Sequence, residues 1–305
     1  MGIDIIGKKR LFLAISGILI LLSVISLSIK GLNLGVDFTG GSLIRLRFES
    51  PVSAAQVMNV LVSQELSDLH LDKAVVQPVK GTSDVQVRAH VNGRPFNDEQ
   101  LERVLNVLGE RLGKVNVVES EMVEPIIGGE LLRRALIACI IGSIGILIYV
   151  SARFEFKFAT AAVIALVHDV LITLGAFSLM GREVNSPFMA AILTILGYSI
   201  NDTIVVYDKI RENLKIRRRG EGLAELVNRS ILETMTRTLN TLITTLLAVV
   251  AVYMFGGATI RDFALALIIG LTSGTYSSIF IASSIWLDWK NWEREREKRA
   301  ALAKA

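Results

Sequence analysis

Ionisable side chains inside long apolar segments are the feature of this sequence most capable of chemistry. His168 and Asp169 lie in the middle of one such segment, Asn201 and Asp202 lie in the next, and Arg237 lies at the start of a third. A charged side chain near the centre of a membrane helix costs at least about 2.5 kcal/mol, so such residues usually face a bundle interior or a partner. We therefore take these five residues as candidate ion-coupling residues, with Asp202 and Arg237 as the primary pair.

Asp202 and Arg237 are expected at similar depth on two helices. Burial disfavours the ionised form of an aspartate and a nearby arginine favours it, so a movement of Arg237 would switch whether Asp202 holds a proton. A static buried ion pair that joins two helices is the alternative. For His168 and Asp169 the same choice stays open, because they could also cap or cross-link neighbouring helices.

Motifs of soluble enzymes are absent from the sequence. It holds no G-x-x-x-x-G-K-[ST], no G-x-G-x-x-G and no G-x-S-x-G, which removes the usual sites of ATP hydrolysis, dinucleotide chemistry and serine hydrolysis. Cys139 is the one cysteine, and the three histidines are far apart without ligand spacing. We therefore expect no enzyme activity, no cofactor and no metal site.

The polar positions must be held by apolar helices. Hydrophobic residues make up 51% of the 305 residues and the mean hydropathy is +0.51. They gather in six nearly uncharged blocks of about 20 residues, each long enough to cross a bilayer. No A-x-A cleavage site follows the first block, so we expect an anchor there and not a signal peptide. The expected spans are Leu11–Ile29, Leu131–Val150, Phe158–Met180, Pro187–Tyr207, Thr238–Phe255 and Phe263–Trp286.

Basic residues set the expected orientation. Lysine and arginine gather before the first span, in the loops after the second and fourth spans, and after the last span. Because cytoplasmic loops carry this excess, we expect both termini in the cytoplasm of a bacterial inner membrane. The net charge of +4 then reflects topology and contact with lipid headgroups, not nucleic-acid binding. The expected parts are a cytoplasmic N-terminus and first span (1–30), an extracytoplasmic domain (31–130), spans two to six (131–288) and a cytoplasmic tail (289–305).

The polar segment between the first two spans has the pattern of an α+β domain. Ser42–Glu49 alternates like a strand, a helix is expected from Ser53 to about Glu65, and Asn97 with Gln100 has the spacing of a capping box. Further strands are expected at Val75–Val79, Val85–Ala89 and Val115–Val123. The order βαββαβ indicates a ferredoxin-like fold.

Two glycine pairs are expected to be structural. Gly40 and Gly41 allow positive φ or close backbone contact where the chain leaves the first span, and Asp37 can cap that turn. Gly270 and Gly274, four residues apart among serines and threonines, make one face of the last span small, as in closely packed membrane helices. We expect this face to pack against a second bundle of the same architecture.

Several segments of the sequence resemble the SecF family of protein-export membrane proteins, and the resemblance covers nearly the whole chain. The matching residues are Gly35–Gly41, His168-Asp169, Gly197–Asn213, Arg237-Thr238 and Arg261–Ser278. The resemblance implies a six-helix bundle of the RND superfamily with an inserted ferredoxin-like domain. It also implies a SecD partner that completes twelve spans, and ion coupling at the positions of Asp202 and Arg237.

The function implied by the resemblance is a late step of protein export. SecF with SecD uses the proton or sodium gradient to promote translocation of SecA-dependent preproteins through SecYEG, and YajC and YidC are further partners of the family. Two other functions remain as alternatives. One is half of an RND-type small-molecule exporter, which would need a larger outer domain. The other is a translocon scaffold whose buried charges are purely structural.

Overall fold

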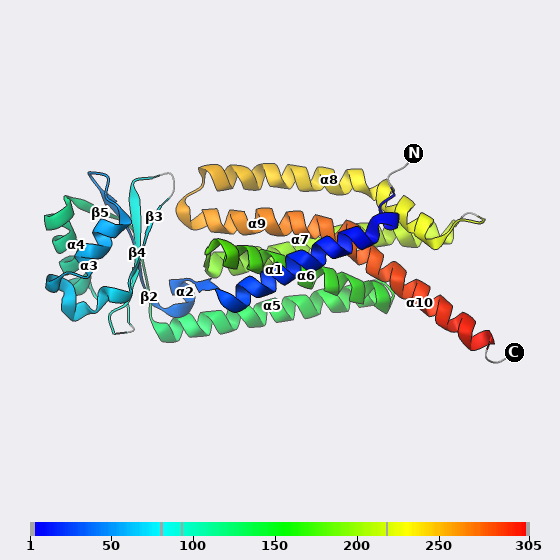
Figure 1. Cartoon of the computed structure of the whole chain (residues 1–305), viewed down its shortest axis with the longest axis horizontal. Coiled ribbons are helices and arrows are strands. Elements are labelled where there is room, and N and C mark those ends of the chain that lie inside the picture. The colour runs from blue at the N-terminus through cyan, green and yellow to red at the C-terminus, as the bar shows by residue number, and fades with distance from the viewer. Residues whose placement is uncertain (1–3, 80–81, 93, 218, 303–305) are drawn as a thin grey trace. The chain divides into compact units, whose positions relative to one another are not determined.

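The computed structural model describes residues 4–79, 82–92, 94–217 and 219–302, and the chain divides into two compact units (Figure 1). The helical unit contains Met1–Asn33, Ala138–Glu183 and Pro187–Ala305, and the α+β unit contains Leu34–Ile137 and Val184–Ser186. The prediction of a helical bundle with an inserted α+β domain is confirmed. The division into four functional parts stays a prediction.

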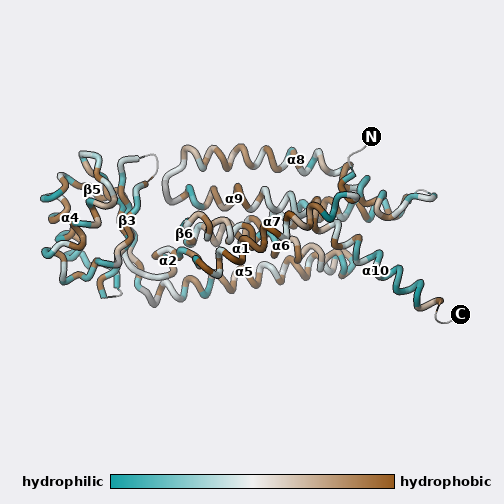
Figure 2. The backbone as a smooth tube through the Cα atoms, in the orientation of Figure 1, coloured by the Kyte–Doolittle hydropathy of each residue, from teal (hydrophilic) through white to brown (hydrophobic). Residues whose placement is uncertain are grey.

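Six helical segments of the described chain are long and apolar enough to cross a membrane. Figure 2 shows hydrophobic residues along α1 and α6 and polar residues along α10. Several helices run on beyond the predicted spans, because hydropathy marks only the apolar part of a helix and not its polar ends. The six segments are α1 (Lys9–Ile29), α5 (Pro125–Arg153), α6 (Phe156–Met180), α7 (Ser186–Lys215), α8 (Leu223–Phe255) and the series α9 (Ala258–Tyr276), η4 (Ser277–Ala282) and α10 (Ser283–Leu302).

The last of these segments contains a π-helix, η4, between α9 and α10. Ser277 and Ser278 begin it, and both are fully buried. Figure 1 shows the chain changing direction where α9 gives way to α10. Sharp bends in helices often lie at π-helical turns. Such turns are rare and are frequent at functional sites.

Small residues let α1 and α6 pack closely. A Cβ added at Gly175 of α6 would collide with the Cα and side chain of Ser23 of α1. Nearby, Ser26 and Ser178 share a hydrogen bond of 2.8 Å between their hydroxyls. These contacts fix α1 on the helix that carries His168 and Asp169.

The α+β unit is a four-stranded antiparallel sheet with strand order β3-β4-β2-β5. Its strands are β2 (Gly41–Phe48), β3 (Val75–Pro78), β4 (Asp84–Ala89) and β5 (Val115–Val123), and its two longer helices are α3 (Ala54–Leu61) and α4 (Asp98–Leu112). The apolar core lies between them and includes Ile44, Leu46, Leu61 and Leu108. Short elements complete the chain: η1 (Ile6–Lys8), β1 (Asn33–Leu34), α2 (Val36–Thr39), η2 (Gln64–Leu69), η3 (Leu71–Lys73) and β6 (Glu183–Val184).

Local capping fixes both helices of this unit. The capping box of Asn97 and Gln100 is confirmed, with Gln100 N donating to Asn97 Oδ1 at 2.7 Å. Ser53 and Gln56 form a second box at the start of α3. The helix expected to reach Glu65 instead ends at Leu61. Ser63 adopts an extended conformation, after which a 3₁₀ turn begins.

Asp84 forms the one fully buried ion-pair centre among the described residues of the sheet. It lies directly opposite Arg47 in the β2–β4 register. Arg47 Nε donates to Oδ1 at 2.7 Å, and Arg45 Nε donates to Oδ2 at 3.0 Å. The hydrogen bond from Arg47 holds the pKa of the Asp84 carboxyl below its usual range, with the charges of both arginines acting in the same direction.

The two adjacent glycines adopt the positive φ that the sequence predicts. Gly40 has φ 73° and Gly41 has φ 113°. A Cβ at Gly41 would also lie 3.0 Å from the carbonyl oxygen of Ala89. Close approach continues on the other side, because a Cβ at Gly128 would lie 3.0 Å from Gly40 N and from the Phe38 carbonyl. There is therefore no room for a side chain at Gly41 or at Gly128.

Valine at Gly41 is expected to destabilise the α+β unit by about 2 kcal/mol, because a β-branched residue is strained at this φ and would press on the β4 backbone. Folded yield in membranes should fall together with export activity. Gly129→Val is the control, since its Cβ would meet nothing within 4 Å and its φ is ordinary. Normal abundance with abolished export in Gly41→Val would instead indicate a direct functional role.

Candidate functional site

Asp169 lies inside a group of serine hydroxyls that come from three other helical segments. Its side chain, on α6, is fully buried. Ser199 Oγ of α7 donates to Oδ2 at 2.7 Å, Ser273 Oγ of α9 donates to Oδ1 at 2.8 Å, and Ser277 Oγ of η4 donates to Oδ2 at 2.8 Å. We call these three residues the serine cage. The carboxylate thus joins α6, α7, α9 and η4 at one point.

His168 occupies the fourth acceptor position of the same carboxylate. Its Nδ1 lies 3.0 Å from Asp169 Oδ1, and the imidazole is only 4% exposed. A carboxylate has about four lone-pair positions. The three serine hydroxyls lie at three of them and His168 Nδ1 lies at the fourth. Every acceptor position of Asp169 is therefore occupied.

Asp202 is as deeply buried but has far fewer partners. It lies on α7 about one turn beyond Ser199 and is 2% exposed. Thr275 Oγ1 donates to its Oδ2 at 3.0 Å and is the one hydrogen-bond donor that the described residues bring to it. Beside it, Thr203 and Ser278 share a hydrogen bond of 2.7 Å, which holds α7 against η4. Asp202 therefore has acceptor positions left over for a proton.

Arg237 lies apart from this buried group. Its side chain, on α8, is exposed, and no ion pair within 4 Å joins it to Asp202 in the described chain. Its charge is still near enough to act on the Asp202 carboxylate. Asn201 is exposed too. The conformation therefore lacks the static buried ion pair that was one alternative for Asp202 and Arg237.

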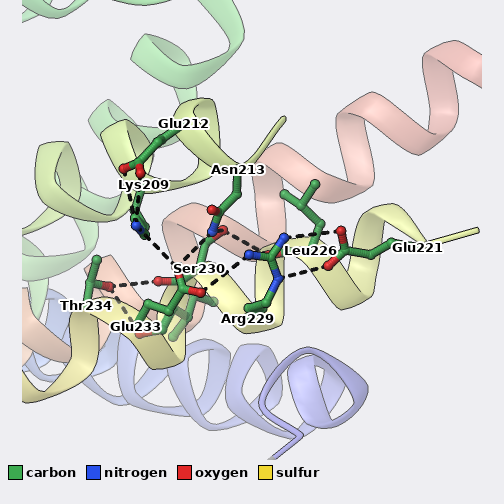
Figure 3. A network of polar contacts seen from close by, with 10 residues as sticks. Lys209, Glu212, Asn213, Glu221, Leu226, Arg229, Ser230, Glu233 and Thr234 are labelled. Atoms are coloured by element: carbon green, nitrogen blue, oxygen red, sulfur yellow. Dashed lines mark hydrogen bonds and ion pairs between the residues drawn. The ribbon is translucent and has the colours of Figure 1, made fainter. Parts of the chain in front are cut away.

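A polar network joins one end of α7 to the start of α8, the two helices that carry Asp202 and Arg237 (Figure 3). Glu233 of α8 lies 3.4 Å from Lys209 Nζ and accepts from Asn213 Nδ2 at 3.0 Å, both on α7. Arg229 adds a two-pronged contact with Glu221, at 2.9 and 3.1 Å. Glu233 is one turn from Arg237, so this network joins α8 to α7 about one turn from Arg237.

The small face of α9 is already covered within this chain, which corrects the expectation of a second bundle there. A Cβ at Gly270 would collide with the side chain of Ile195, and a Cβ at Gly274 would lie 2.8 Å from Ser199 Cβ. Both neighbours are on α7. The close packing that the glycines predict is present, but α7 is the partner, because it must approach closely for Ser199 to reach Asp169.

Asp37 does not cap its own turn. Its Oδ2 accepts a hydrogen bond of 2.8 Å from the backbone N of Ser186, the first residue of α7.

In the described residues no group of three histidine, cysteine, aspartate or glutamate side chains gathers as a metal site would require.

Sequence reasoning missed the serine cage as part of the site. The sequence places Ser273 and Ser277 among the small residues around Gly270 and Gly274, where they indicate close helix packing, and no motif distinguishes Ser199. Their i, i+4 spacing on the last span and the presence of an intramembrane aspartate were the available signals, since a buried carboxylate needs hydrogen-bond donors. Which serines supply them depends on helix rotation and depth, which spacing alone leaves open.

The chain matches two families of the export machinery. Residues 104–292 match the family described as Protein export membrane protein SecD/SecF, C-terminal, and residues 25–52 match the SecD/SecF GG motif. It is 43% identical to the protein translocase subunit SecF of Acidaminococcus fermentans, over 93% of this chain and 96% of that protein. It is 43% identical to the SecF subunit of Vibrio alginolyticus, over 87% of this chain and 82% of that protein.

Solved structures agree with this likeness. The crystal structure of SecDF from Thermus thermophilus, a translocon-associated membrane protein, matches 95% of this chain with a TM-score of 0.85 at 40% identity. A super-membrane-facing form of SecDF matches with a TM-score of 0.71. This chain spans about two fifths of those SecDF chains, 39% and 40%. With this coverage and identity, the chain belongs to the SecD/SecF family of protein-export membrane proteins, in its SecF branch.

Proposed function

We propose that this chain is the SecF-type half of a protein translocase and that its bundle couples ion movement across the membrane to a late step of protein export. The observation that carries the coupling part is the contrast between two buried carboxylates. Asp169 has four hydrogen-bond donors and Asp202 has one. Asp202 is therefore the carboxylate that can take up and release a proton, with Arg237 as the charge that changes its affinity.

The partner in this proposal is a SecD-like subunit. Support comes from the solved SecDF chains, which are more than twice as long as the part that this chain matches. The finer partners, SecYEG, SecA-dependent preproteins, YajC and YidC, follow from the family resemblance alone. The bacterial inner membrane also follows from the resemblance. The cytoplasmic position of both termini is supported in addition by the basic residues in the loops at one end of the spans.

The energy available is large enough for the task. Moving one elementary charge through 100 mV yields about 2.3 kcal/mol, which biases a two-state rearrangement roughly fiftyfold. The energy is used only if the ion is bound from one side and released to the other. The exposed Arg237 and the buried, under-bonded Asp202 fit one state of such a cycle.

Asparagine at Asp202 is expected to leave folding and partner binding intact and to abolish the stimulation of export by the ion gradient, because the amide cannot take up a proton. Arg237→Met should lose the stimulation too, and the double variant should be no worse than either single one, since both act on one step. The measurement is export into inverted membrane vesicles with and without an uncoupler.

Asp208→Asn is the matched control, an exposed carboxylate on the same helix that lies 3.7 Å from Arg153. It should keep full stimulation. If Asp202→Asn also kept full, uncoupler-sensitive stimulation, coupling would lie elsewhere and the proposal would fail. A scaffold without coupling predicts no gradient-dependent difference between any of these variants.

A further inference from the structure

His168 holds a buried nitrogen that has no hydrogen-bond partner among the described residues. The residue is 4% exposed, and its Nε2 has no hydrogen-bond partner there. An unpaired polar atom inside a bundle is costly, so each one calls for a reason, and a role in the chemistry of the site is one such reason. The export function has no use for this atom if Asp202 alone carries the ion.

The tautomer of His168 follows from its neighbour. Asp169 is acceptor-only when ionised, so Nδ1 must carry the hydrogen in the 3.0 Å contact with Oδ1. In the neutral ring Nε2 is then the acceptor, with a free lone pair. A carboxylate that holds Nδ1–H orients the ring and stabilises the imidazolium that forms when Nε2 gains a proton.

We propose that His168 Nε2 is an internal proton-accepting site of the bundle, and that Asp169, held by the serine cage, is its fixed counter-charge. The step is one protonation: a proton binds the Nε2 lone pair, the imidazolium forms, and the pair with Asp169 becomes neutral overall. The ligand is a proton. The inference rests on the proposed function for its purpose, as a second proton site, but not for its existence.

The surroundings hold few other charges. The titratable group that contacts the imidazole from another element is Tyr276 of α9, whose ring stacks on it with centroids 6.2 Å apart. Its hydroxyl donates to the carbonyl of Phe12 on α1 at 2.9 Å. The described residues of α1 between Leu11 and Ile29 include no ionisable side chain. From α7, Asp202 lies one turn beyond the cage, and η4 supplies only hydroxyl and apolar side chains. Asp169 is therefore the dominant charge at His168.

A purely structural tether makes a different prediction. Three serines would be enough to hold Asp169 and join the helices, and the imidazole would then stay neutral at every pH at which the chain is folded. Proton binding at His168 and its dependence on the Asp169 charge separate the two.

The test is a pH titration of the full chain in lipid nanodiscs, followed by NMR of ¹⁵N-labelled histidine. The chain has three histidines, His70, His90 and His168, and the His168→Gln variant assigns the buried one. We expect both ring nitrogens of His168 to move to imidazolium positions as the pH is lowered. In Asp169→Asn the midpoint should fall by at least one pH unit, a tenfold weaker proton affinity.

Thr173→Val is the matched control, because among the described residues its hydroxyl bonds only the backbone carbonyl of Asp169, at 2.8 Å. It should leave the midpoint unchanged. If Asp169→Asn does not fold, Ser273→Ala takes its place: with one donor to Oδ1 removed, the midpoint should rise. A ring that stays neutral throughout, or a midpoint that does not respond to these changes, overturns the proposal.

The same titration in Asp202→Asn separates this inference from the proposed function. If coupling through Asp202 is wrong, the export assay shows it while the His168 titration persists. If the His168 site is wrong, the titration fails while loss of gradient stimulation in Asp202→Asn stands.

Discussion

Alanine at Asp84 is expected to destabilise the α+β unit by about 3 kcal/mol, because the mostly buried Arg45 then keeps only Glu119, at 3.3 Å, as an ion-pair partner. Breaking a buried ion pair by removing one side typically costs about 3–5 kcal/mol. We expect the lower end, since the side chain of Arg47 is 56% exposed and regains water while that of Arg45 is 13% exposed. In hydrogen exchange of the full chain, β2 and β4 should exchange about a hundredfold faster, as 1.4 kcal/mol is one decade.

The control is Asp68→Ala, which removes an exposed carboxylate paired with Arg103 at 2.7 Å. Exposed pairs contribute little, so exchange in β2 and β4 should stay near that of the wild type. Equal protection in Asp84→Ala and the wild type would show that the buried pair is not what holds these strands.

Acid should have a matching effect on the same strands. The pKa of Asp84 is lowered in the folded state, chiefly by the hydrogen bond from Arg47. Its stabilising contribution is therefore present above the unfolded value of about 3.9 and is lost as the pH falls through the lower folded value. The Asp84→Ala variant should lack this part of the acid dependence.

Leucine at Gly274 is expected to lower the free energy of unfolding of the helical bundle by about 3 kcal/mol or more. A single Cβ there would already lie 2.8 Å from Ser199 Cβ and 3.3 Å from Ser199 Cα. Neither atom can swing away as a flexible side chain would, so α9 and α7 must separate. Ser199 would move away from Asp169 as well. The yield of monodisperse protein after heating in detergent should fall sharply.

Gly145→Leu on α5 is the control, because a Cβ there meets nothing within 4 Å. Co-purification of a SecD-like subunit should decline only as far as the folded yield declines. A Gly274→Leu chain that folds normally but no longer binds its partner would return this face to an intersubunit role.

The features that the sequence predicts well are local or one-dimensional. Asn97 and Gln100 form their capping box within four residues, and the length of each apolar block predicts a span without any knowledge of its neighbours. Positive φ at Gly41 follows from a glycine pair at the end of a span. None of these depends on which other element lies nearby.

The features that it predicts poorly are contacts between distant elements. Asp84 and Arg47 meet only because of the β2–β4 register, which a strand pattern does not specify. The small face at Gly270 and Gly274 indicates close approach but not by which helix. The serine cage needs the rotation and depth of α6, α7 and α9 together, so Asp169 looked secondary to Asp202 although it has more partners.

The π-helical turn η4 gives the last span a place where α10 can rotate about the helix axis relative to α9. An α-helix turns about 100° and rises 1.5 Å per residue, so a return of Ser277–Ala282 to α-helical bonding would rotate α10 against α9 by about that angle. Gly274 keeps α9 seated on α7, and Trp286 of α10 stacks on Phe158 with ring centroids 4.5 Å apart. Torsion between these two anchors would act on Ser277, and so would pull one of its four hydrogen bonds from the Asp169 carboxylate.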